Sequence, residues 1–444
     1  NEYKHLSGNV MEMFCSYSQL VDSTLVMLNG ASKDDVTENH FDIDATITRE
    51  GMFTGIVTAS YTIAKDSLCM FKVDLNPELS IDSITTEPGK QISYRRTKDK
   101  NYQRLNVYIL LDDKQTVNGS LKLTFYYSGK IAESVVNIFY ISAMYGWYPE
   151  YGWRQRATYT MNFHSPKGIE FVATGTPADR IEKDNILHTK WELTEPASDA
   201  SFSIGFMKKY QFTDEVAGTV DVYYDEELSR LFAEYFAAQN DEIVKIGAHM
   251  EKQGGEDLVN AIRLFSHRFG KRAVNSLSAS EIAAWHGQSF PGFLHLSAIT
   301  WMTTDSHGRQ RLFRAHEVAH QWWGTGVSYS NYHDQWLSEG FAEYSALMYV
   351  QAVEGNDQFL DILKKYRKDI FGNRKFLIGE AEEEGPIAMG YRTQSSKAVG
   401  GAHSLIIYKK GAIVLHMHRN LFLDLNTMSE DDFFDMMIEW YATY

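Results

Sequence analysis

The segment LFRAHEVAHQWWGTG, residues 312–326, contains two histidines four positions apart, with a glutamate directly after the first. In an α-helix, residues i and i+4 lie on one face a turn apart, so His316 and His320 can direct two imidazole nitrogens at one ion. Glu317 then flanks the ion without binding it, which suits a general base acting on water. The alternative is the polar face of an ordinary helix, because so short a match also arises by chance in a chain with 15 histidines.

A catalytic zinc takes three protein ligands and leaves a fourth position open to water. We interpret Glu339 as the third ligand, because it begins a second predicted helix, WLSEGFAEYSALMYV, with eighteen residues between it and His320. That spacing lets the chain leave one helix, turn, and return antiparallel to it. Two histidines and one glutamate form the ligand set of a catalytic site. We interpret Glu343, one turn beyond Glu339, as a surface or salt-bridged residue in preference to a partner of a ligand.

The sequence also predicts where these two helices begin and end. Asp305 or Ser306 is the expected N-cap of the first helix, and Gly324 is its expected end. Asp334 is the expected N-cap of the second helix. These boundaries place the two histidines near the end of one helix and Glu339 near the start of the next.

Length and composition predict a folded chain of more than one domain. The 444 residues exceed what one compact core normally holds, and 44% of them are hydrophobic and 14% aromatic. The net charge of −15 argues against binding to a phosphate backbone, so we expect no nucleic-acid partner. The chain begins at Asn1 and ends at Tyr444 inside a predicted helix, so we expect it to be part of a longer protein that is truncated at the C-terminus.

Hydrophobic periodicity divides the chain into three regions. Residues 1–37 are predicted to be a partly helical leader. Residues 38–213 hold short segments rich in Val, Ile, Thr, Tyr and Phe, separated by turn formers, which predict an antiparallel β domain. From residue 214 to residue 444 helical periodicity dominates, as in EELSRLFAEYFAAQN, with strand-like pieces such as SEIAAWHG and FLHLSA. The predicted fold class is therefore α+β and multidomain, with a β domain before a mostly α domain.

Three blocks of this sequence resemble the gluzincin metallopeptidases of the membrane alanyl aminopeptidase and leukotriene-hydrolase family. The first is H-E-x-x-H followed by the glutamate in WLSEGFAEY, the second is IIYKKGAIVLHMHRNLF, and the third is YPEYGWRQRATYTMNFHSPKGIEFVATG. The resemblance implies a saddle-like N-terminal β domain followed by a thermolysin-like catalytic domain. It also implies one Zn²⁺ per chain and a peptide substrate.

The resemblance gives each residue of the predicted site a role. It implies that His316, His320 and Glu339 bind the zinc and that Glu317 is the general base. Tyr408, in the second block, corresponds to a tyrosine that donates a hydrogen bond to the oxyanion formed during hydrolysis. Without the block around it, Tyr408 would be interpreted as a core tyrosine of an apolar helix.

One segment departs from the family pattern. Aminopeptidases of this family carry a G-x-M-E-N strand before the zinc helix, whose glutamate anchors the free α-amine of the substrate. In the matching register this chain has Pro291-Gly292-Phe293-Leu294-His295, which puts Leu294 at the position of the glutamate. We therefore predict altered recognition of the N-terminal amine. The candidate substrate-binding residues are Gln288, Gly292, Leu294 and, from the β domain, Glu150.

The predicted function is a zinc-dependent metallopeptidase that hydrolyses peptide bonds and resembles an aminopeptidase. Two alternatives remain open at this stage: another zinc hydrolase on the same fold, and a catalytically silent binding scaffold. The family also includes proteins attached to membrane proteins, so a membrane-tethered, extracytoplasmic setting is compatible with segments outside this chain. The sequence itself does not determine the compartment.

Overall fold

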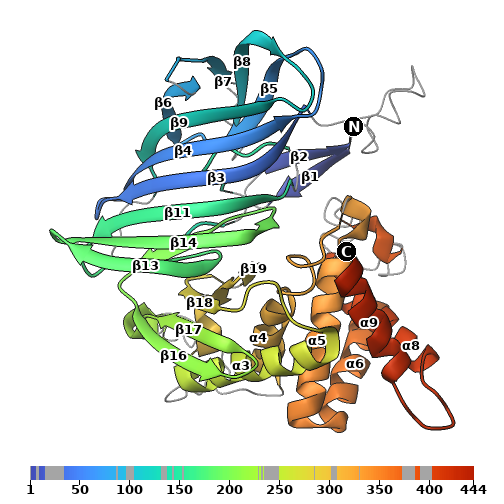
Figure 1. The fold of residues 1–444 in the computed structure, drawn as a ribbon. Helices are drawn as coiled ribbons and strands as arrows, with labels where there is room; N and C mark the ends of the chain where they lie inside the picture. The colour runs from blue at the N-terminus through green and yellow to red at the C-terminus, as the bar shows by residue number, and fades with distance from the viewer. Residues whose placement is uncertain are drawn as a thin grey trace. The chain divides into compact units, whose positions relative to one another are not determined.

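The computed structural model describes most of the chain, in two compact units. The described residues are 2–6, 10–15, 35–86, 89–96, 105–131, 138–142, 145–152, 155–228, 230–231, 234, 250–284, 286–301, 308–329, 331–372, 386–390 and 403–444. The first unit contains Leu6–Lys208 and the second contains Lys209–Tyr444. Each unit is described by itself below (Figure 1).

A seven-stranded sheet forms the main body of the first unit (Figure 1). In sheet order its strands are β13 (Thr176–Lys183), β14 (Ile186–Ala197), β11 (Ala157–Pro166), β3 (Val36–Ile47), β4 (Met52–Ile63), β9 (Ser120–Lys130) and β6 (Leu79–Thr86). All neighbours are antiparallel except β3 and β11, which run parallel. Buried and exposed residues alternate along the central strands, so one face packs on a core and the other meets solvent.

The first unit also contains two three-stranded sheets. One contains β5 (Leu68–Leu75), β8 (Leu105–Gln115) and β7 (Ser93–Arg96), and the other contains β10 (Phe139–Tyr140), β15 (Phe202–Gly205) and β12 (Glu170–Ala173). Aromatic side chains pack between strands, with Trp147 in edge-to-face contact with Phe53 and Phe202. The β-rich N-terminal domain predicted from the alternating segments is therefore present.

The N-terminal residues differ from the prediction. We predicted a partly helical leader over residues 1–37, but β1 (Glu2–Leu6) and β2 (Val10–Cys15) pair as a two-stranded sheet. The prediction is wrong for these residues because a short apolar run such as VMEMF fits a strand as well as a helix. The remainder of the predicted leader helix, residues 16–34, lies outside the described residues.

The second unit joins a small sheet to a set of helices. The sheet has the order β16 (Lys208–Asp214), β17 (Gly218–Tyr224), β18 (Leu277–Ile282), β20 (Phe293–Ser297) and β19 (Gln288–Phe290). The helices are α3 (Met250–Phe269), α4 (Arg309–Ala319), α5 (Trp336–Glu354), α6 (Asn356–Phe371), α8 (Gly411–Leu421) and α9 (Asp431–Thr443), with a π-helical segment, η6 (Ser404–Lys410), before α8. Short 3₁₀ turns are η2 (Ala298–Trp301), η3 (Tyr332–Asp334) and η5 (Ile387–Met389).

The core of the second unit is centred on α5. Every residue of this helix from Gly340 to Val350 is buried, which explains its near-continuous apolar sequence. The strand predicted from FLHLSA appears as β20, whereas of SEIAAWHG only the first three residues lie in a strand, at the end of β18. The helix predicted over EELSRLFAEYFAAQN lies mostly outside the described residues. Among the described helices, none is long and apolar enough to cross a membrane.

The ends of the two site helices were predicted incorrectly where they can be compared. α4 begins after Gly308, which adopts a left-handed conformation (φ 68°) and provides no side-chain cap; Asp305 and Ser306 lie outside the described residues. α4 ends at Ala319, before Gly324, because the backbone tightens into turns in which the N–H groups of Gln321 and Trp322 donate to the carbonyl oxygens of Val318 and Ala319, three residues back. Asp334 belongs to η3 and is not the cap of α5, whose N-cap position is Gln335.

Candidate metal centre

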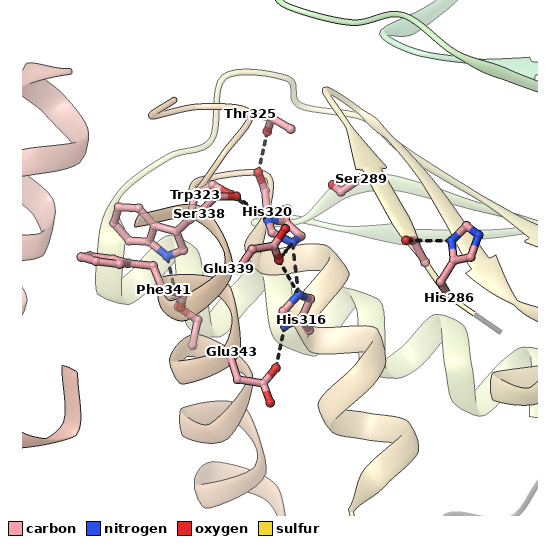
Figure 2. A network of polar contacts seen from close by, with 12 residues as sticks. His286, Ser289, His316, His320, Trp323, Thr325, Ser338, Glu339, Phe341 and Glu343 are labelled. Atoms are coloured by element: carbon pink, nitrogen blue, oxygen red, sulfur yellow. Dashed lines mark hydrogen bonds and ion pairs between the residues drawn. The ribbon is translucent and has the colours of Figure 1, made fainter. Parts of the chain in front are cut away.

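Three donor atoms from two neighbouring helices converge in the second unit. His316 and His320 come from α4 and its C-cap, and Glu339 comes from the first turn of α5, which packs against α4. The two Nε2 atoms lie 3.1 Å apart, and Glu339 Oε2 lies 3.4 Å from His316 Nε2 and 3.3 Å from His320 Nε2. Figure 2 shows the three side chains pointing toward one another. The structure thus brings together the three residues that the spacing predicted as one group of potential metal ligands.

The size of this triangle suits a zinc ion. Nitrogen and carboxylate ligands bind zinc at about 2.0–2.2 Å, so two ligands of a tetrahedral site lie roughly 3.4 Å apart. The observed separations of 3.1 Å, 3.4 Å and 3.3 Å fall close to that value. A metal can therefore enter with side-chain shifts of a few tenths of an ångström.

The hydrogen bonds made by the Nδ1 atoms of His316 and His320 determine whether their Nε2 atoms carry a proton or a lone pair. His316 Nδ1 lies 2.7 Å from Glu343 Oε2, and His320 Nδ1 lies 2.8 Å from the carbonyl oxygen of Trp323. Both partners accept, so each neutral imidazole carries its proton on Nδ1 and keeps a lone pair on Nε2. Two lone pairs and a carboxylate oxygen then face one another in a buried space. Only a cation satisfies all three.

The charges of the cluster indicate the same requirement. Burial raises the pKa of Glu339, but the neighbouring imidazoles lower it more, so its pKa lies well below the usual value. Burial lowers the pKa of His316, but the hydrogen bonds to Glu339 and Glu343 raise it by more than burial lowers it, so the pKa is well above the usual value. A positive charge is therefore stabilised at this cluster. The donor set, the distances and the charge all fit a divalent cation.

Glu343 is more closely tied to the site than we interpreted it to be from the sequence. It is buried, with 9% of its surface exposed, and it holds His316 Nδ1 through Oε2 while its Oε1 accepts the hydroxyl of Tyr366 from α6. The spacing from Glu339 contained this signal, because i and i+4 share a helix face. Tyr366 and the Trp323 carbonyl had no comparable signal, since their roles depend on tertiary packing.

Glu343→Gln is expected to weaken zinc binding about tenfold, because partners that orient a ligating histidine typically contribute 10–100-fold to metal affinity. The amide keeps the size of the side chain but removes its charge. The matched control is Glu354→Gln, which makes the same change near the other end of α5, where the carboxylate pairs with Arg311. Competition with a chromophoric chelator measures the affinity. Equal zinc affinities in Glu343→Gln and the control would show that Glu343 does not support the site.

Glu317 lies beside the ligand triangle without joining it. Burial raises the pKa of its carboxyl group despite the two nearby imidazoles. Its Oε2 has no hydrogen-bond partner among the described residues. Gly287 lies so close that a Cβ there would overlap Glu317 Oε1, so a residue without a side chain leaves room for the carboxylate. A buried carboxylate with a raised pKa and one unused oxygen is suited to accepting a proton.

Tyr408 reaches the site from a part of the chain far away in sequence. Its ring stacks on His316 with 5.5 Å between centroids and 10° between planes. Two glycines permit this approach, since a Cβ on Gly340 would meet Gly411 Cα at 3.1 Å, and Gly340 directly follows Glu339. Tyr408 lies within η6, a π-helical segment, and such segments often occur at functional sites.

A hairpin of β19 and β20 is fixed to the end of α4 by one glutamine. Gln321 Nε2 donates to Ser289 Oγ at 2.8 Å and to the Phe290 carbonyl at 2.9 Å, and its Oε1 accepts the Gly292 N–H at 2.8 Å. Gly292 has φ 72° in the hairpin turn, directly after Pro291. Its backbone conformation and its bond to Gln321 explain the glycine without a substrate contact.

The structure contradicts the predicted role of Leu294. Its side chain is completely buried (0% exposed) in the core of the second unit, so no substrate reaches it. Ser289 pairs directly opposite Leu294 and therefore shares its face, but lies on the edge strand β19 and is partly exposed. The sequence analysis missed Ser289, although the turn formers in FPGF mark residues 288–290 as the strand before the turn. Gln288 lies in the same strand, on the opposite face.

Glu150 belongs to the first unit. It has 9% of its surface exposed, and its backbone exchanges hydrogen bonds with Asp74, from Asp74 N–H to Glu150 O at 2.7 Å and from Glu150 N–H to Asp74 O at 3.1 Å. Its predicted contact with a substrate stays a prediction.

Comparison with known proteins gives a family match in the same part of the chain. Residues 296–442 match the model of the peptidase family M1 domain. Endoplasmic reticulum aminopeptidase 2 from Homo sapiens is 32% identical over 108 residues, and the same protein from Bos taurus is 31% identical over 106 residues. Each match covers 23% of this chain and 10% of the relative, so the chain matches only a small part of these proteins.

Solved structures resemble the chain over most of its length. The crystal structure of an M1 zinc metallopeptidase from Deinococcus radiodurans has a TM-score of 0.67 and 16% sequence identity, and the match covers 92% of this chain and 87% of that one. A mutant of that enzyme bound to a Tyr-Ser-Ala substrate has a TM-score of 0.66 and 16% identity, with the same coverage. At this identity the likeness concerns the fold: a β-rich N-terminal domain followed by a helical C-terminal domain.

Proposed function

We propose that the chain is a zinc-dependent peptidase that hydrolyses peptide bonds in an aminopeptidase-like manner, since residues 296–442 match the model of the peptidase family M1 domain. The observation that supports this most is the convergence of His316, His320 and Glu339 within 3.4 Å, with Glu317 beside them. We assign the first three as the zinc ligands. Glu317 is the proposed general base, and Tyr408, from a part of the chain far away in sequence, provides a phenol.

Each residue of the site has a separate role in the proposed hydrolysis. When bound, zinc supplies Lewis acidity that polarises the scissile carbonyl and makes water more acidic. Glu317 accepts the proton of the attacking water and later passes it to the leaving amine, a role for which its unused Oε2 is available. Tyr408 donates its phenolic hydrogen to the oxygen that gains negative charge as the carbonyl is attacked. Glu343 and the Trp323 carbonyl hold both imidazoles in the orientation that directs Nε2 inward.

Tyr408→Phe is expected to lower kcat by about 10²–10³-fold with little change in KM, because removing one oxyanion donor affects the transition state more than the bound substrate. The phenylalanine ring keeps the stacking on His316, so zinc content should stay that of the unmodified protein. Steady-state kinetics on a peptide amide provide the measurement. A variant with unchanged kcat would remove Tyr408 from the mechanism.

We further propose that the end-group site recognises the substrate amine weakly. From His286 to Ser297 the hairpin contains no acidic side chain. Shifting the expected G-x-M-E-N segment five residues earlier, to His286–Phe290, places Ser289 at the position of the anchoring glutamate. This register agrees with the partial exposure of Ser289 and the complete burial of Leu294. A hydroxyl at this position accepts a hydrogen bond from an ammonium group but contributes no charge to its binding.

The ratio of kcat/KM for a free peptide to that for its N-acetylated form is therefore expected to be small. Ser289→Glu should raise this ratio about ten- to a hundredfold, because a charge-assisted hydrogen bond contributes about 1.5–3 kcal/mol. Ser289→Gln is the matched control, since it adds a side chain of the same size without a charge. Leu294→Glu, in contrast, buries a carboxylate in the core and should prevent folding.

Two outcomes of this comparison between free and N-acetylated peptides would contradict the proposal on amine recognition. An unmodified protein that cleaves only free N-termini has a charged anchor elsewhere, and Glu150→Gln would then be the informative variant. Equal ratios in Ser289→Glu and Ser289→Gln would show that Ser289 does not face the amine.

Peptide cleavage separates the proposed function from both alternatives. A different zinc hydrolase and a binding scaffold would each leave every peptide intact while keeping the metal. The buried Glu317 with an unused oxygen favours catalysis over the scaffold, because an unpartnered buried carboxylate costs stability that a binding role does not require. Attachment to a membrane protein stays a prediction from the sequence.

A further inference from the structure

Two histidines meet on the solvent-exposed face of the seven-stranded sheet in the first unit. His164 on β11 and His188 on β14 are direct cross-strand partners, and their Nδ1 atoms lie 2.7 Å apart. Asp44 on β3 lies on the other side of His164, with Oδ2 3.2 Å from His164 Nε2. Their side chains reach solvent, with 25% of the His164 side chain and 52% of the Asp44 side chain exposed.

The protons of this cluster follow from its geometry. Asp44 is an acceptor, so His164 carries its proton on Nε2 and keeps a lone pair on Nδ1. His188 must then donate its own Nδ1 proton to that lone pair, because two bare nitrogens at 2.7 Å would repel. If the proton of His188 lies on Nε2 instead, the Nδ1 lone pairs of His164 and His188 point at the same position between the two rings. No proton leaves the protein in this change, so a cation can replace the shared proton at neutral pH.

The arrangement repeats that of the metal centre in the second unit. There, Glu343 accepts from one ring nitrogen of His316, and the other ring nitrogen faces an imidazole nitrogen of His320 at 3.1 Å. Here, Asp44 takes the place of the carboxylate, His164 that of the oriented ligand, and His188 that of the second imidazole. A carboxylate that fixes the tautomer of a histidine is the usual partner of a metal-binding imidazole.

We propose that His164 and His188 form a second metal site, which takes a divalent transition-metal ion with a preference for imidazole, such as Zn²⁺, Ni²⁺ or Cu²⁺. Both Nδ1 atoms bind the ion, Asp44 orients His164, and water fills the remaining positions. Separating the nitrogens from 2.7 Å to the roughly 3.4 Å of a tetrahedral site needs only small side-chain rotations on an exposed surface.

The charged neighbours of the pair do not oppose a cation. Lys190, two residues beyond His188 on the same face, is ion-paired with Glu192 at 2.5 Å. Lys167, which follows β11, is ion-paired with Glu182. The nearest acidic group, Asp44, favours the cation directly. The electrostatic potential at the two histidines therefore favours a bound cation, which two imidazoles alone would bind weakly.

Titration with Zn²⁺ tests the proposal on the protein whose first zinc equivalent is already bound. Calorimetry should detect a second equivalent per chain, and equilibrium dialysis should count it. His188→Gln should weaken this second binding at least about tenfold, since losing a ligand costs more than losing its supporting partner. Asp44→Asn should weaken it less. Peptide hydrolysis should be unchanged in both variants, so the result is independent of the proposed function.

His40 provides the matched control on the same face of the sheet. Its Nδ1 lies 2.7 Å from Thr158 Oγ1 and its Nε2 lies 3.4 Å from Asp42, so it has a carboxylate partner but no second imidazole. His40→Gln should leave the second equivalent intact. The absence of a second equivalent in the unmodified protein would overturn the proposal. So would equal zinc affinities in His188→Gln and His40→Gln.

Discussion

Glu317→Gln is expected to keep its zinc and its fold while losing about 10²–10⁴-fold in kcat, the usual contribution of a positioned general base. The amide occupies the same buried space next to Gly287, so the packing is preserved. It cannot accept the proton of the attacking water, because the amide nitrogen is a donor and the amide oxygen is a very weak base. Steady-state kinetics on a peptide amide, with zinc content measured on the same sample, give the result.

The zinc measurement makes the kinetic result interpretable. Equal zinc content in Glu317→Gln and the unmodified protein shows that the lost rate reflects proton transfer and not a lost ion. Circular dichroism and the midpoint of thermal unfolding check the fold. A kcat within a few-fold of the unmodified protein would mean that another group is the base.

Replacing the histidines is expected to have the larger effect on the metal. His320→Ala removes one of three ligands and should lose most of the zinc, and the double variant His316→Ala/His320→Ala should lose all of it together with peptide hydrolysis. Removing a ligand also leaves Glu339 as a partly buried carboxylate without the imidazole that lowers its pKa, so a lower stability is expected as well. Elemental analysis should find near one zinc per chain in the unmodified protein.

Retention of stoichiometric zinc in the double variant would contradict the assignment of the ligands. His403→Ala is a matched control, since its ring centroid lies 6.1 Å from that of Tyr408 and it does not belong to the group of potential metal ligands. That variant should keep its zinc. A loss of zinc in the control as large as in His320→Ala would indicate a general collapse of the region.

The sequence predicted the group of potential metal ligands because local geometry determines it. Four residues of α-helix place His316 above His320 in any protein, and the length of the connection allows Glu339 to return to them. The β-rich first unit was equally accessible, since alternation along strands reports burial directly. Tyr408 was different: it is far from the ligands in sequence, and only the resemblance of its surrounding block connected it with the site.

The hairpin beside the site was the main failure. We matched Pro291–His295 to the family segment, but Pro291 and Gly292 form a turn, and the strand on the edge is β19. The position that we expected to contact the substrate, Leu294, is completely buried instead. The roles of Tyr366 and Gln321 were not predictable from the sequence either, because the first depends on the packing of α6 against α5 and the second on the position of β19 next to the end of α4. The first strands, β1 and β2, were missed because their apolar runs are too short to show a period.

Peptide hydrolysis measured during a zinc titration tests the central claim most directly. The protein is stripped with a chelator, freed of it, and given Zn²⁺ in steps while the rate on a free-amine peptide amide is followed. The account predicts no rate in the stripped protein, a linear rise, and a plateau at one zinc per chain, with no rise in the His316→Ala/His320→Ala variant. A rate that persists without zinc, or no rate at one bound equivalent, would contradict the assignment of this chain as a zinc-dependent peptidase.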